Sequence, residues 1–208
     1  MSYSDFTLEK VQADFSLILE EKRHLFTAVD PVPPSELLQM TLEEYLPLAI
    51  DINSEKARSE FIIAPILGDI RRQTHYQVSL FSGKEFNVGK TKGLNGLCDF
   101  ILSRSTEQLY IRTPVVTIVE AKNENLIGGI GQCIAAMVGA QIFNQQSQNS
   151  VKKIYGAVTT GTNWRFLFLQ DKTIYLDATE YYIREVERIL GILLQPIRSL
   201  VAKDIKAF

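Results

Sequence analysis

The sequence predicts a mixed α/β fold in which helices flank a central sheet. The first observation is the order of the patterns, with helical periodicity over residues 55–70 and 130–146 and short apolar runs between and after these segments. The second is a stretch without any charged residue, from Leu126 to Ser150, which is typical of a helix buried against a sheet. Helices and strands that follow one another in this way favour layers of helix packed on a sheet.

Length and composition are those of an ordinary globular protein. With 208 residues, the chain is expected to form a single domain (1–208) with a sizeable core. No apolar stretch reaches the roughly 18 residues of a membrane span, and the first residues carry an acid instead of a basic run. We therefore expect no membrane association and a cytoplasmic location. Cys98 and Cys133 lack metal-ligand spacing and are expected to be buried, reduced thiols.

Residues 1–50 are predicted to form an N-terminal helical extension. Apolar residues recur at helical spacing over residues 5–28, and the prolines of residues 31–34 cannot continue a helix. Residues 37–46 are predicted to form a second, short helix or a strap along the core.

Residues 54–160 contain the strongest patterns. A helix is expected over residues 55–70, in which Pro65 should cause a bend or the loss of one hydrogen bond. In the helix over residues 130–146, Gly131, Ala135 and Gly139 share one face, which we expect to lie close on a sheet. Strands are predicted over residues 76–81, 85–88, 97–102, 114–122 and 154–160.

Residues 161–208 are predicted to complete a hairpin and to add a closing helix. The Thr160–Asn163 stretch is a turn signal between the strand at 154–160 and another at 164–170. A further strand is expected over residues 173–177, and helical periodicity extends from Glu180 to Phe208.

Three charged residues occur on neighbouring apolar strands. Asp99 lies in the middle of the 97–102 strand, and Glu120 and Lys122 end the 114–122 strand on the same face, because strand side chains alternate. Desolvating an unpaired charge costs roughly several kcal/mol, so these residues require an explanation. Two carboxylates at one end of a sheet are typical ligands of Mg²⁺, with Mn²⁺ as a substitute, and the backbone carbonyl of Ala121 is a further candidate ligand.

The same residues indicate a reaction. A bound metal ion lowers the pKa of a coordinated water and offsets charge on a phosphoryl oxygen. Lys122, beside Glu120, is placed to orient or deprotonate that water and to offset developing negative charge. The sequence therefore predicts metal-dependent hydrolysis of a phosphodiester.

Asp99 followed 21 positions later by Glu120-Ala121-Lys122 resembles the signature of the PD-(D/E)XK superfamily, the restriction-endonuclease-like nucleases. The resemblance covers residues 54–160 and is nearest to the endonuclease domains of type I restriction enzymes. It implies an αβββαβ core and a DNA endonuclease with a role in restriction or defence. The sequence departs from the family pattern at Cys98, where proline usually precedes the aspartate.

The resemblance also implies supporting residues and partners. The upstream helix of this superfamily often supplies another acid, for which Glu60 is the candidate and Glu55 the alternative. Many members carry a glutamine early in the helix after the lysine, and Gln132 matches it. DNA is the implied partner, and a homodimer or a larger restriction-type complex is expected because two sites are needed to cut both strands.

Other interpretations remain open. The net charge of −2 is unusual for a dedicated nucleic-acid binder. It favours a rival hypothesis, a catalytically inactive nucleic-acid-binding or scaffold subunit on the same fold. Any basic surface must therefore be local. One candidate cluster comprises Arg71, Arg72, His75, Lys84, Lys90 and Lys92. An ordinary solvated loop and helix end explains these residues equally well. A small-molecule enzyme is disfavoured because the chain shows no nucleophile–base pair or cofactor loop. Three aromatic residues suit base stacking but more often serve packing, namely Trp164, Tyr181 and Tyr182.

Overall fold

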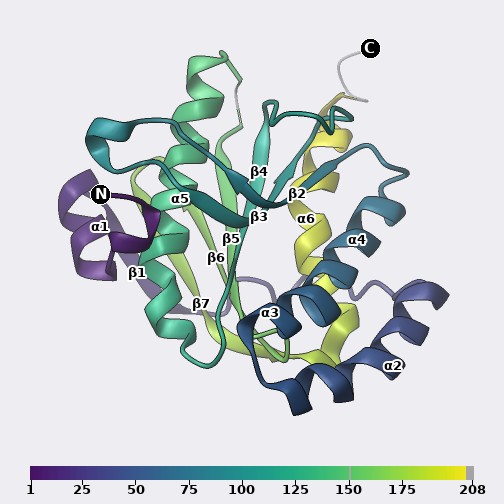
Figure 1. The fold of residues 1–208 in the computed structure, drawn as a ribbon. Helices are drawn as coiled ribbons and strands as arrows, with labels where there is room; N and C mark the ends of the chain where they lie inside the picture. Colours follow the sequence, from purple (N-terminus) through teal and green to yellow (C-terminus); the bar gives the residue numbers. More distant parts are fainter. Residues whose placement is uncertain (150, 205–208) are drawn as a thin grey trace.

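A seven-stranded mixed sheet forms the centre of the molecule (Figure 1). The computed structural model describes residues 1–149 and 151–204, with side chains as far as residue 198. The strand order is β1-β7-β6-β5-β4-β3-β2; β1 and β7 are parallel, as are β4 and β5, and the other neighbours are antiparallel. The strands are β1 (Ile18–Arg23), β2 (Ser79–Glu85), β3 (Leu97–Ser103), β4 (Val115–Ala121), β5 (Lys153–Thr159), β6 (Asn163–Gln170) and β7 (Thr173–Tyr182).

Helices cover both faces of the sheet (Figure 1). On one face lie α5 (Leu126–Gln146), α1 (Leu8–Phe15) and the short 3-10 helix Tyr3–Asp5. The other face carries α2 (Glu36–Ile52), the helical run Glu55–Gln73 and α6 (Val186–Asp204). Each face has its own apolar cluster, with the sheet between them. The predicted α/β class, with a mixed sheet flanked by helices, is thereby confirmed.

The prediction of one helix over residues 5–28 is wrong. Helix α1 begins at the cap Thr7, whose side chain accepts from the Lys10 amide, and it ends at Ser16, which has a left-handed backbone (φ 53). The chain then forms β1, parallel to β7. The expected N-terminal helical extension (1–50) thus supplies a strand to the sheet, although its second helix is present as α2 and is longer than expected.

The helix predicted over residues 55–70 is present but irregular. It consists of α3 (Glu55–Arg58), a π-helical turn (Ser59–Ile63) and α4 (Ala64–Gln73). Pro65 has no N–H to donate, and its ring would clash with the carbonyl four residues earlier. A π turn widens the helix just before the proline and so accommodates that clash.

Helix α5 is the buried core helix that its composition predicts, but it begins at Leu126 instead of residue 130 because Asn125 caps it. Its glycine face does not contact the sheet as expected. A Cβ on Gly131 would lie 2.4 Å from the Thr7 carbonyl carbon, and one on Gly139 would lie 2.6 Å from the Tyr3 hydroxyl oxygen. This face therefore receives the N-terminal segment. The sheet approaches instead at Gly156, where a Cβ would lie 2.5 Å from Met137 Sδ.

Among the described residues, α5 is also the helix that is long and apolar enough to cross a membrane. Most of it is buried between the sheet and the N-terminal segment, as expected of a core helix.

Three further boundaries differ from the sequence predictions. Strand β2 is continuous over Ser79–Glu85, where two shorter strands were expected. Strand β7 extends to Tyr182 because Glu180 and Tyr181 pair with β6, so α6 begins at Val186 instead of Glu180. The last four residues of the expected closing helix, 205–208, lie outside the described residues.

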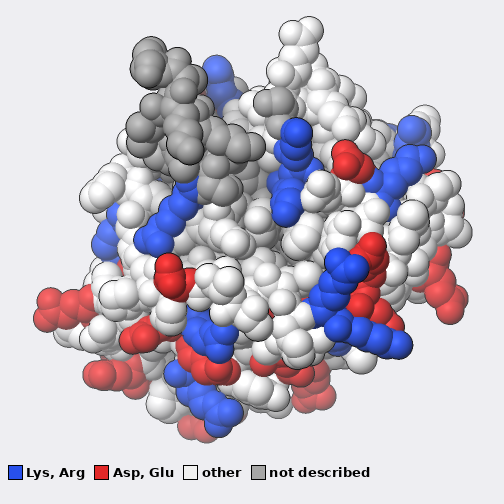
Figure 2. All heavy atoms as spheres, turned by 180° about the vertical axis from the view of Figure 1, so that it is seen from behind, with Lys and Arg blue, Asp and Glu red and all other residues white. Residues whose placement is uncertain are grey.

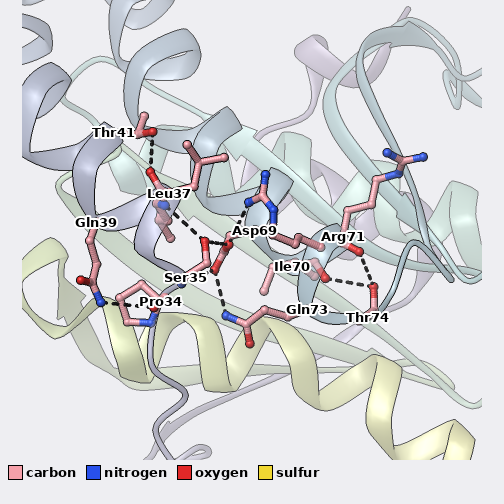
Figure 3. A network of polar contacts seen from close by, with 12 residues as sticks. Pro34, Ser35, Leu37, Gln39, Thr41, Asp69, Ile70, Arg71, Gln73 and Thr74 are labelled. Carbon is pink, nitrogen blue, oxygen red and sulfur yellow. Dashed lines mark hydrogen bonds and ion pairs between the residues drawn. The ribbon is translucent and has the colours of Figure 1, made fainter.

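A buried carboxylate joins α2 to α4 (Figure 3). Asp69 is fully buried and accepts hydrogen bonds from the Ser35 hydroxyl and from the Ser35 amide at 3.2 Å. Gln73 Nε2 donates to it at 2.8 Å, and Arg72 forms an ion pair with it at 3.2 Å. Since Ser35 also caps α2, this network sets where α2 starts relative to α4.

Candidate active site

Asp99 and Glu120 lie where the β3–β4 pairing ends. The last paired residues are Phe100 and Val119. Asp99 directly precedes Phe100 and Glu120 directly follows Val119, so in this antiparallel pair both acids lie one position beyond the last pair. Beyond this pair, the Ala121 amide donates to Asp99 Oδ2 at 2.8 Å, so the aspartate side chain replaces a backbone acceptor of the ladder. The carboxylate of Asp99 is thereby fixed at the edge of the site and remains partly accessible.

Lys122 connects the second acid to α5. Its Nζ donates to Glu120 Oε1 at 2.6 Å and to Gln132 Oε1 at 3.4 Å. Glu120 is only 2% exposed, whereas Lys122 and Gln132 are partly accessible. The structure thus brings together Asp99, Glu120, Lys122 and Gln132, four of the residues singled out from the sequence.

Burial dominates the electrostatics of Glu120. It raises the pKa of this carboxyl, the nearby charge of Asp99 raises it further, and the Lys122 ammonium opposes both effects, with a result of about 8. A hydrogen bond between the two carboxyl groups also favours the protonated form. Negative charges on Asp99 and Glu120 at the same time are therefore unfavourable, unless a cation binds to both carboxylates.

Lys122 is held in its charged form. Burial lowers its pKa, but the charge and hydrogen bond of Glu120, together with the charges of Asp99 and Glu55, outweigh burial and raise it overall. The neighbouring Cys98 thiol has a pKa raised well above its usual range by burial and by the two acids. Cys98 and Cys133 are both buried and free, as expected.

Gly129 in the first turns of α5 gives Lys122 its path. A Cβ at this position would lie 3.0 Å from both Cγ and Cε of Lys122 and 2.7 Å from Val158 Cγ1. The lysine chain therefore lies directly against the helix backbone. This role of Gly129 cannot be predicted from the sequence, because nothing in the spacing of the glycines at 128–131 indicates which side chain passes over them.

The upstream acids line a hollow of about 250 Å³ that opens at Asp99. Glu60 lines it, but its exposed carboxylate forms an ion pair with Lys56 at 3.0 Å. Glu55 lines the same hollow and acts electrostatically on Lys122. The geometry therefore links Glu55, the alternative, more directly to Lys122 than Glu60.

The donor set suits a hard cation that takes only a few of its ligands from the protein. Within residues 1–149 and 151–204, no group of three or more histidine, cysteine, aspartate or glutamate side chains is placed to hold a metal ion. Asp99 and Glu120 alone supply two carboxylates, which is the number that Mg²⁺ commonly takes from a protein, with water and substrate phosphate as its remaining ligands. A divalent cation would also relieve the repulsion that raises the Glu120 pKa.

A second hollow, missed from the sequence, begins at Asn123, directly after Lys122. It measures about 460 Å³ and includes Arg58 and Arg165 in its lining. These arginines come from α3 and β6, more than a hundred positions apart in the chain, and only the fold brings them together.

The other sequence candidates serve the core or the general surface. Trp164 and Tyr181 are buried, and their polar atoms donate to the Gly161 carbonyl and to Asp177. Arg72 is paired with Asp69, and Arg71 lies over the Tyr76 ring. Figure 2 shows basic and acidic side chains interspersed over the face opposite to the view of Figure 1.

No protein-family model, curated protein or solved structure matches this chain.

Proposed function

We propose that this chain is a magnesium-dependent phosphodiester hydrolase, a DNA endonuclease of the PD-(D/E)XK type with a restriction-endonuclease-like core. One observation carries the proposal: a buried Glu120 with a raised pKa is bonded to Lys122 beside Asp99, at the ends of two strands. A merely structural ion pair does not require a second carboxylate at the same place. A role in restriction or defence, in a homodimer or a larger complex, follows from the resemblance alone.

Asp99 and Glu120 would hold the cation, and Ala121 would add its carbonyl. When bound, Mg²⁺ or Mn²⁺ supplies a water of lowered pKa and offsets charge on a phosphoryl oxygen. The hollow of about 250 Å³ beside Asp99 leaves room for the substrate phosphate. In the reaction, the water oxygen forms a bond to phosphorus and one ester P–O bond breaks. A proton of the water passes to solvent, and the leaving oxygen takes up a proton from solvent to form a hydroxyl group.

Lys122 contributes charge in this scheme. Its raised pKa keeps the ammonium protonated, so it is suited to donate to a phosphate oxygen as negative charge develops there. Of the roles that the sequence suggests for Lys122, this favours charge stabilisation over deprotonation of water. Gln132 orients the ammonium through its side-chain oxygen.

A second candidate is a catalytically inactive nucleic-acid-binding or scaffold subunit. It is favoured by the Glu120–Lys122 contact at 2.6 Å, in which Lys122 offsets part of the negative charge of the site without a divalent cation, and by the mixed surface charge in Figure 2. The two candidates differ in metal binding, because a scaffold needs no divalent cation at Asp99 and Glu120. Titration calorimetry with Mg²⁺ and Mn²⁺ on the parent and on Asp99→Asn separates them.

Cleavage of supercoiled plasmid tests the proposed reaction. Asp99→Asn and Lys122→Met should each lower the rate by at least about a hundredfold, the usual loss when a group that stabilises transition-state charge is removed. Lys10→Met, which removes a partly accessible lysine that pairs with Asp14 on α1, is the matched control and should cut as the parent does. Circular dichroism checks that the variants fold. Parental rates in both site variants would show that the assignment is wrong.

A further inference from the structure

We propose that the hollow of about 460 Å³ beside Lys122 binds a backbone phosphate of the nucleic-acid strand, next to the phosphate that is cleaved. The identity of the ligand as nucleic acid rests on the proposed function. The hollow itself is a separate site, formed by the link from β4 to α5, the β5–β6 turn and side chains of α3 and β6.

The location follows from the β4-α5-β5 unit. Strands β4 and β5 are parallel and end together, where the Lys122 amide donates to the Thr159 carbonyl at 2.8 Å. Ligands of α/β sheets commonly bind outside the carboxyl ends of such strands. Helix α5 also starts here, and its first turn contains no acid, so its partial positive charge is not offset within the helix.

Arg58 is held firmly at the wall of the hollow. Its Nη1 donates to the Thr160 carbonyl at 3.0 Å and to Thr162 Oγ1 at 3.2 Å, and its Nη2 donates to Asn53 Oδ1 at 3.1 Å. A guanidinium that three hydrogen bonds hold in place at the wall of a hollow is preorganised for a phosphate.

Arg165 provides the second guanidinium, and burial distinguishes both arginines from the acids. Arg58 and Arg165 are partly buried, whereas Glu124 and Glu180, which also line the hollow, are exposed. Glu180 in addition accepts a hydrogen bond from Asn163 Nδ2 at 2.8 Å. Charges that are less solvated act more strongly on a ligand, so the wall favours an anion.

The hollow is close enough to the candidate active site to take the neighbouring phosphate. Asn123 lines it and directly follows Lys122. Consecutive Cα atoms are about 3.8 Å apart, so the wall of the hollow begins one residue from the lysine of the candidate active site.

Binding of a short fluorescent DNA duplex in EDTA tests this inference without any cleavage. Arg165→Gln should weaken binding about tenfold, the usual effect of losing a charge-assisted hydrogen bond, and should reduce the salt dependence by about one counterion. Arg165→Lys should retain most of the affinity because it keeps the charge. Arg112→Gln, which changes an exposed arginine outside the hollow, is the control and should bind as the parent does.

Equal binding by Arg165→Gln and the parent would overturn the inference, as would a parent that does not bind the duplex at low salt. Inorganic phosphate that raises the melting temperature of the parent, without any duplex binding, would assign the hollow to a free anion and overturn it too. Weakened binding by Arg165→Gln with no cleavage by the parent would support the site while removing the nuclease. Cleavage by the parent, together with undiminished binding by Arg165→Gln, would support the nuclease and overturn the phosphate site.

Discussion

At the scale of single residues, Glu120 combines two demands that conflict in the metal-free protein. Its side chain is almost completely buried among apolar strands, yet its neighbour Asp99 adds negative charge at the same point. Lys122 compensates only in part, because the pKa of Glu120 remains raised to about 8. Such a site gains most from a ligand that carries more than one positive charge.

The raised pKa of Glu120 predicts how stability depends on pH. Between the ordinary value of 4.5 and about 8, the folded state binds more protons than the unfolded state. The free energy of unfolding should therefore fall as the pH rises through this window. Glu120→Gln lacks the titrating group and should fall less steeply. Denaturant unfolding of both proteins in EDTA, from about pH 5 to 9, measures the difference, and superimposable profiles would contradict it.

Gly129 predicts a change in activity that is separate from stability. In a Val158→Ala background, which removes the 2.7 Å contact, Gly129→Ala should displace Lys122 and lower cleavage about tenfold to a hundredfold. The helix itself should not be weakened, because alanine is favoured over glycine within a helix by about 1 kcal/mol.

Gly128→Ala in the same background is the matched control, since the nearest atoms that a Cβ there would meet belong to Asn125 and not to Lys122. Equal cleavage rates in the two glycine variants would show that Gly129 does not position the lysine.

The period of a strand explains why part of the site can be predicted. Charges at Glu120 and Lys122 on one face of an apolar strand stand out locally, and Asp99 interrupts the neighbouring strand in the same way. Arg58, Gly129 and Arg165 carry no such local signal. Their positions depend on where α3, α5 and β6 pack, so only the tertiary structure reveals them.

At the scale of elements, the Asp69 network joins two helices that the sequence treats separately. The carboxylate accepts from Ser35 before α2 and from Gln73 and Arg72 on α4 (Figure 3). Since α3, the π turn and α4 form one helical run, this network also fixes the run that carries Glu55 and Arg58 toward the two hollows.

Asp69→Asn should destabilise the protein by about 2–4 kcal/mol, because an amide nitrogen would face donors in a buried site. Asp51→Asn, at an exposed position of α2, is the control and should have little effect. Urea unfolding measures both. A loss of less than about 0.5 kcal/mol in Asp69→Asn would contradict the role of the network.

Elements with a strong local pattern could be predicted, and those that depend on distant partners could not. The uncharged α5 and the apolar runs of β3 and β4 have one plausible assignment each, and their bounds differ from the predicted ones by a few residues at most. In contrast, Ser16 adopts a left-handed backbone without the usual glycine, so nothing local marks the end of α1. Strand β1 then depends on pairing with β7, and no residue near β1 in the sequence indicates this partner.

At the scale of the whole molecule, the two parallel pairs have different origins. Strands β4 and β5 are joined by α5, whose position against the sheet depends on Gly156. Strands β1 and β7 come from distant parts of the chain, and the segment before β1 packs on the outer side of α5 (Figure 1). The candidate site lies where the first unit meets β3, whereas the second pair completes the edge of the sheet.

The pairing of Ile18 with Thr173 means that β1 cannot join the sheet until β7 has been synthesised on the ribosome. Translation adds roughly 5–20 residues per second, so β1 waits about ten seconds or longer for its partner strand to be made. During that interval the nascent chain already carries Asp99, Glu120 and Lys122 without a completed sheet. The order of the strands therefore separates the moment at which these residues are synthesised from the moment at which the fold that supports them is closed.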